Sequence, residues 1–111
     1  MIFNQYYAVL SSREVRKKHL YGVTRLGRKL VFFRTKEGKV ACIEDRCCHR
    51  GASLCTGKLL NGRVQCPFHG FEYDPDGKVA LIPANGKKSP VTSNFKVRSY
   101  VCKEKGGLIF V

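Results

Sequence analysis

Short stretches in which apolar or β-branched residues alternate with polar ones recur along the whole chain. Alternation with a period of two is typical of β-strands, because successive side chains point to opposite faces of a sheet. The expected strands cover residues 5–9, 21–26, 29–34, 39–43, 63–65, 78–82, 95–101 and 108–111. The pattern therefore predicts an all-β fold that is mostly antiparallel.

Glycine-containing dipeptides separate these stretches at regular intervals. They are Leu26-Gly27, Glu37-Gly38, Asn61-Gly62, Asp76-Gly77, Asn85-Gly86 and Gly106-Gly107. Glycine reaches positive φ without steric cost, and tight hairpin turns require positive φ. We therefore expect hairpins at these positions.

One segment has the spacing of a short helix instead. Ser11 and Glu14 are three residues apart, as in a capping box, and a basic stretch follows. We expect a helix over residues 11–18 of at most about two turns. Residues 85–94 form the one extended polar segment and predict a surface loop.

The length of 111 residues, of which 43% are hydrophobic, leaves room for a single domain over residues 1–111. The first residues lack the features of a signal peptide, and the longest apolar run, residues 30–33, is far shorter than the roughly 20 residues of a membrane-spanning helix. We therefore expect a soluble, cytoplasmic chain that does not contact membranes and whose six cysteines are reduced.

Two short clusters combine the side chains that bind transition metals. They are Cys47-Cys48-His49 and Cys66-Pro67-Phe68-His69, with sixteen residues between His49 and Cys66. Each cluster offers one thiolate and one imidazole, which suits either tetrahedral zinc or a two-iron cluster. One Cys and one His in each loop give each of two metals a ligand from both loops, whereas structural zinc sites more often pair cysteines at Cys-x2–4-Cys spacing. The spacing therefore favours an iron–sulfur cluster.

The two clusters and their flanks resemble the cluster loops of the Rieske family. Residues 47–54, CCHRGASL, are similar to the first loop, and residues 66–71, CPFHGF, are similar to the second. The resemblance implies a Rieske-type antiparallel β-sandwich with a cluster-binding subdomain over residues 46–71. Cys48 departs from the pattern, because oxygenases of this family usually have proline there.

The resemblance also implies a ligand set for one [2Fe-2S] cluster per chain. Cys47 and Cys66 would hold one iron, and His49 and His69 would hold the other through ring nitrogens. With two thiolates the formal charge of the oxidised cluster is zero, so it is easier to reduce than a cluster with four thiolates.

The second loop carries a further indication of the reduction potential. Respiratory members of the family have an extra disulfide between the loops and a serine after the second His-Gly, and the corresponding positions here are Phe68 and Phe71. With fewer hydrogen bonds to the sulfurs, we expect a potential toward the low end of the Rieske range. The ligand imidazoles would make the potential fall at alkaline pH.

The resemblance extends to terminal oxygenases of the monooxygenase type. Residues 44–46, 82–86 and 97–100 are similar to stretches of vanillate demethylases and of pheophorbide or chlorophyllide oxygenases. Those enzymes bind a mononuclear iron through two histidines and a carboxylate in a second domain. Of the three histidines here only His19 is left outside the cluster, so we assign no catalytic residue and expect an electron carrier.

The expected role is therefore the N-terminal part of a longer oxygenase subunit, which passes electrons from a reductase or ferredoxin to the oxygenase catalytic domain. The isolated domain would be monomeric and its parent trimeric. Two alternatives stay open. One is a free-standing Rieske-type ferredoxin, and the other is a zinc-stabilised basic binding module.

The net charge bears on the partner. Twenty-one Lys and Arg against eight Asp and Glu give +13, which attracts acidic partners. The basic residues are spread through the chain without an aromatic-rich nucleic-acid motif. We therefore expect an acidic reductase or ferredoxin rather than nucleic acid.

The remaining cysteines and the third histidine have less specific expectations. Cys42 and Cys102 lie in or beside strand-like segments and are expected to pack in the core as free thiols. Cys48 and Cys55 lie near the cluster loops without paired ligand spacing. His19 follows a basic run and is expected at the surface.

Overall fold

The computed structural model describes residues 6–48, 52–67, 70–81 and 96–111. Over these residues every strand pairing is antiparallel, in three sheets. The first sheet has the order β1-β11-β10, the second β2-β3-β4-β9 and the third β5-β6-β7-β8. The predicted all-β fold is confirmed.

The strands of the first sheet are β1 (Ala8–Ser11), β10 (Lys103–Lys105) and β11 (Leu108–Phe110). Those of the second are β2 (Tyr21–Arg25), β3 (Arg28–Arg34), β4 (Val40–Glu44) and β9 (Ser99–Tyr100). Those of the third are β5 (Lys58–Leu60), β6 (Arg63–Gln65), β7 (Glu72–Tyr73) and β8 (Val79–Leu81). Two single 3₁₀ turns, η1 (Ser12–Glu14) and η2 (Leu54–Thr56), complete the described elements.

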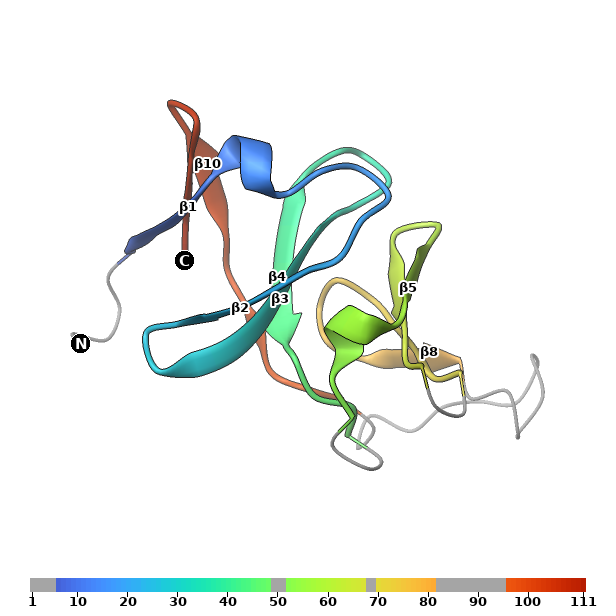
Figure 1. Ribbon diagram of the computed structural model, residues 1–111. Coiled ribbons are helices and arrows are strands. Elements are labelled where there is room, and N and C mark those ends of the chain that lie inside the picture. The colour runs from blue at the N-terminus through green and yellow to red at the C-terminus, as the bar shows by residue number, and fades with distance from the viewer. Residues whose placement is uncertain (1–5, 49–51, 68–69, 82–95) are drawn as a thin grey trace.

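The second sheet is the middle layer, because both faces of β3 are buried. Val31 and Phe33 point into a core shared with the third sheet, whereas Leu30 and Phe32 point into a core shared with the first sheet. The period of two along the strand separates these pairs onto opposite faces. A strand that is buried on both faces needs apolar side chains at consecutive positions, which accounts for the sequence Leu-Val-Phe-Phe. Figure 1 shows the first and third sheets at opposite ends of the molecule, with β2, β3 and β4 between them.

The predicted turns are found where the described residues include them. Leu26-Gly27, Asn61-Gly62 and Gly106-Gly107 have positive φ at both positions. That conformation matches the twist of tight two-residue hairpins. Asn85-Gly86 and the expected surface loop lie outside the described residues.

Several strand bounds differ from prediction. The strand expected over residues 5–9 is β1, which is displaced toward η1 by its pairing with β11. The strand expected over residues 95–101 is reduced to β9. Its segment first bridges the third sheet, between Lys96 and Lys78, and only then pairs with β4 of the second sheet. Strands β5, β7 and β10 were not predicted.

The expected helix over residues 11–18 is only the 3₁₀ turn η1, so its predicted extent was wrong. The capping box itself is present: Glu14 Oε1 accepts from the Ser11 N–H at 3.0 Å, and Ser11 Oγ accepts from the Arg13 N–H at 3.4 Å. The turn ends because Val15 adopts an extended conformation with its side chain buried, and Lys18 has a φ of +66°. In the described part of the chain, no helix has the length and apolar character needed to cross a membrane.

Candidate metal centre

Two loops are each closed at their base by a backbone hydrogen bond of the same kind. The Cys47 N–H donates to the Ala52 carbonyl at 2.7 Å, and the Cys66 N–H donates to the Phe71 carbonyl at 2.7 Å. Gly70, with a φ of +69°, precedes Phe71 where the second loop returns. The two cysteines therefore occupy equivalent positions at the base of two loops of equal span.

The Cys47 and Cys66 side chains belong to one buried cluster. Each residue is 3% exposed, neither is in a disulfide, and both lie in the core between the second and third sheets. His49 and His69, the other two predicted ligands, lie outside the described residues. Within the described ranges, no group of three or more His, Cys, Asp or Glu side chains is placed to hold a metal ion.

Tyr73, which sequence reasoning did not single out, points its hydroxyl at the first loop from β7. Its Oη lies 3.2 Å from the Cys47 Sγ and 3.1 Å from the Cys48 Sγ, and it accepts from the Cys48 N–H at 2.8 Å. A hydroxyl has one proton to donate, and a thiolate is a stronger acceptor than a thiol. A metal-bound Cys47 thiolate would therefore receive it.

Tyr73 is fully buried, and this burial governs its ionisation. Burial raises the pKa of Tyr73, and the hydrogen bonds with Cys47 and Cys48 raise it further. The phenol therefore stays a neutral hydrogen-bond donor over the ordinary pH range. Phe71 and Tyr73 are two positions apart, so in a strand their side chains point to the same face. This spacing is the feature of the sequence that could have identified Tyr73 as a neighbour of the site.

Asp45 links the two ends of the first loop. It is the one charged side chain that is buried among the described residues, at 8% exposed. Its Oδ1 accepts from the Cys55 N–H of η2 at 2.8 Å, and its own N–H donates to the Lys29 carbonyl at 3.1 Å. The carboxylate thus joins the strand before the loop to the turn after it.

The Cys55 side chain is packed tightly against Gly22 of β2. A Cβ on Gly22 would lie 2.5 Å from the Cys55 Sγ, so only glycine fits on β2 at this point. Burial, followed by the hydrogen bond to Asp45, raises the pKa of Cys55 to about 11. The thiol stays protonated at neutral pH, whereas a metal ligand has to be deprotonated.

The other predicted positions follow expectation in part. Cys42 is fully buried, and its hydrogen bond with Cys102 raises the pKa of the Cys42 thiol together with burial. Cys102 is half-buried, so the packing role assigned to both is confirmed. Cys48 and His19 are exposed.

The described residues fit an iron–sulfur cluster in their chemistry. Two buried cysteines that are not in disulfides offer sulfur ligands for soft metal ions, and a hydroxyl donor is directed at one of them. Hydrogen bonds to cluster sulfurs are among the means by which proteins set the reduction potential of such clusters. Two thiols at loop bases also suit zinc, so the donor set alone does not choose between the two.

Comparison with known proteins favours the iron–sulfur cluster over zinc. The Rieske [2Fe-2S] domain family matches residues 5–101. Chlorophyllide a oxygenase of Chlamydomonas reinhardtii is 36% identical over 108 residues, which cover 97% of this chain and 16% of that protein. The oxygenase component of dicamba O-demethylase from Stenotrophomonas maltophilia is 37% identical over 108 residues, covering 97% of this chain and 31% of that protein.

Solved structures of similar proteins have the same fold as this chain. A crystal structure of dicamba monooxygenase superposes with a TM-score of 0.86 and 34% sequence identity, covering 96% of this chain and 33% of that chain. This chain therefore corresponds to about a third or less of the length of these relatives.

Proposed function

The chain belongs to the Rieske [2Fe-2S] family, and from this we propose that it holds one cluster through Cys47, His49, Cys66 and His69 and relays single electrons. The observation that carries the proposal is the equivalence of the two cysteines. Both are buried, and each stands at the base of a loop closed by the same 2.7 Å hydrogen bond. In each loop a histidine follows two or three residues after the cysteine.

The cluster would supply a centre that takes up and releases one electron. The residues of the protein would have three roles at the cluster. Cys47 and Cys66 bind iron, the Tyr73 hydroxyl donates to the Cys47 sulfur, and the apolar side chains of Leu54 and Phe71 exclude water. None of these tasks requires a catalytic acid, base or nucleophile, which agrees with an electron carrier.

We further propose that the electrons come from an acidic reductase or ferredoxin and go to the mononuclear iron of an oxygenase catalytic domain. The support is the +13 charge and the likeness to oxygenases that are three or more times longer than this chain. A cytoplasmic location stays a prediction, since the relatives include a chloroplastic oxygenase.

The test is metal and sulfide analysis of the purified chain beside matched Cys→Ser variants. We expect two irons and two acid-labile sulfides per chain, lost in Cys47→Ser and in Cys66→Ser. Cys102→Ser is the control, because Cys102 lies in the other core and should leave the content unchanged. A colourless protein that contains zinc and no sulfide would overturn the proposal and favour the zinc-stabilised binding module.

A further inference from the structure

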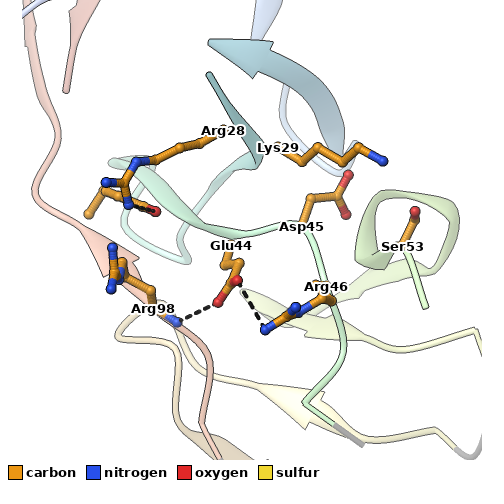
Figure 2. A pocket seen from close by; sticks show the side chains of 8 residues that line it. Arg28, Lys29, Glu44, Asp45, Arg46, Ser53 and Arg98 are labelled. Carbon is orange, nitrogen blue, oxygen red and sulfur yellow. Dashed lines mark hydrogen bonds and ion pairs between the residues drawn. The ribbon is translucent and has the colours of Figure 1, made fainter. Parts of the chain in front are cut away.

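A polar pocket of about 520 Å³ lies at the base of the first loop (Figure 2). It lies where β3 begins, where β4 ends and where β9 pairs with β4. Arg46 and Ser53, on its wall, flank the loop that begins at Cys47. Whatever occupies the pocket is therefore adjacent to the proposed electron-transfer centre.

The lining of the pocket is predominantly basic. Four cations, Arg28, Lys29, Arg46 and Arg98, are set against two carboxylates. Cationic side chains that line one concave surface raise the local concentration of acidic partners.

The two carboxylates are already engaged within the protein. Glu44 accepts from the Arg98 backbone N–H at 3.2 Å and pairs with the Arg46 guanidinium at 3.5 Å, as Figure 2 shows. Asp45 accepts from the Cys55 N–H outside the pocket. Four cations against two carboxylates leave the lining with a net positive charge, and among the described residues neither carboxylate forms an ion pair with Lys29 or Arg98.

Two of the four cations are free to meet a partner. Among the described residues, neither the Lys29 ammonium nor the Arg98 guanidinium has an ion-pair partner, and both residues are exposed. Arg28 is less free, because its guanidinium donates to the Tyr100 hydroxyl at 3.3 Å. Lys29 and Arg98 are therefore the side chains best placed to bind incoming carboxylates.

The chemistry of the pocket points to an acidic protein surface. Small-molecule sites are mostly apolar, whereas this lining is charged. Arginine binds carboxylates through a planar fork of donors. Glu44, between Arg98 and Arg46, disfavours a continuous polyanion such as nucleic acid and leaves separate places for single carboxylates.

We propose that this pocket is the docking point of an acidic electron-donor protein, whose surface carboxylates pair with Lys29 and Arg98. The proposal rests on the proposed electron-transfer function. In the docked pair the donor is oxidised by one electron and the centre at Cys47 is reduced by one electron, with no proton or group transferred.

The test is the rate at which a dithionite-reduced, acidic plant-type ferredoxin reduces the cluster-loaded chain in a stopped-flow mixer. The test variant is Lys29→Glu/Arg98→Glu. The control is Lys103→Glu/Lys105→Glu, which makes the same charge change on exposed β10 in the first sheet, away from the third sheet. Lys29→Gln/Arg98→Gln removes the charges without reversing them.

At about 20 mM salt we expect the charge reversal in the pocket to slow reduction by roughly tenfold or more, and the neutral variant by an intermediate factor. The control should stay within about twofold, and the differences should disappear near 0.5 M salt, where charges are screened within a few ångströms. Visible spectra and reduction by dithionite alone verify that each variant keeps its cluster.

Equal slowing of test and control variants would show that only the overall charge matters and would overturn the docking proposal. So would unchanged rates in both, or an altered oligomeric state of the pocket variant alone, which would assign the pocket to contacts between copies. A wild-type chain that dithionite itself cannot reduce would instead contradict the proposed function, and the docking proposal with it.

Discussion

The hydroxyl of Tyr73 lies 3.2 Å from the sulfur of Cys47, although the two residues are 26 positions apart in the sequence. Cys47 begins the first loop, whereas Tyr73 lies on β7, just after the second. One buried hydrogen bond therefore links the two halves of the proposed cluster site. It also gives the protein a donor directed at a proposed iron ligand.

Tyr73→Phe should lower the reduction potential of the cluster. A hydrogen bond to a ligand sulfur favours the reduced state, which carries more negative charge, so its loss makes reduction harder. A difference of about 1 kcal/mol between the two states corresponds to roughly 40 mV for one electron. Protein-film voltammetry measures the shift directly.

Tyr21→Phe is the matched control for this experiment. It removes a tyrosine hydroxyl that donates to Glu14 at 2.8 Å, at the surface of β2. Its potential should equal that of the wild type. If Tyr73→Phe also left the potential unchanged, the hydroxyl would have only a structural role.

Asp45→Ala should destabilise the fold and accelerate loss of the cluster. It leaves the Cys55 N–H, which is partly buried, without its acceptor, at a cost of about 1–3 kcal/mol. Asp45→Asn keeps an acceptor oxygen and should lose much less. Urea unfolding and the decay of visible absorbance measure the two effects, and equal losses in both variants would refute the hydrogen-bonding role.

Arg34 joins the first and second sheets, and its replacement should be among the most destabilising. Its guanidinium donates to the backbone carbonyls of Val15, Ser12 and Gly38 and pairs with both oxygens of Glu104 on β10. Arg34→Met should lower the free energy of unfolding by about 3 kcal/mol or more, because several acceptors lose their donor together.

Arg34→Lys tests whether geometry or charge matters at this position. Lysine keeps the charge but lacks the planar fork, so it should recover only part of the loss. Thermal unfolding of the two variants gives the comparison. Full recovery by lysine would mean that charge alone accounts for the contribution of Arg34.

The Arg34–Glu104 pair should make stability depend on acid pH. Arg34 holds the pKa of Glu104 below its usual value of 4.5. A carboxyl with a lowered pKa in the folded state contributes stability above its unfolded pKa and loses it as the pH falls through the folded pKa. Because the Glu104 side chain is 34% exposed, screening limits this contribution to below about 1 kcal/mol.

The measurement is the difference in melting temperature between wild type and Glu104→Gln from pH 6 downward. The difference should be present at pH 6 and shrink below pH 4.5. The comparison cancels the acid sensitivity of the cluster, which both proteins share. A difference that stayed constant with pH would contradict the ion-pair explanation.

The strand that holds the run from Leu30 to Phe33 was predicted, and dipeptides such as Asn61-Gly62 marked their hairpins. The burial of both faces of that strand was not predicted, because it depends on the first and third sheets packing against it. The short strands β7 and β10 were not predictable, because two or three residues are too few to show a period. The sequence Lys-Glu-Lys of β10 becomes a strand only through its pairing with β11.

The sequence predicts candidate ligands for the site but does not predict their surroundings. The spacing of Cys47 and Cys66 from their histidines shows in the sequence, and the structure places both cysteines at equivalent loop bases. The contact of Tyr73 with Cys47 spans 26 positions, and that of Asp45 with Cys55 depends on the path of the first loop. Such contacts depend on tertiary packing, which local spacing does not encode.

EPR of the dithionite-reduced chain distinguishes mixed histidine and cysteine ligation of one [2Fe-2S] cluster from ligation by cysteines alone. For mixed ligation we expect an average g-value below that of an all-cysteine cluster, with hyperfine coupling from two imidazole nitrogens in electron spin echo spectra. A signal with an all-cysteine average g-value and no strongly coupled nitrogen, or no signal from a protein that contains zinc, would contradict it.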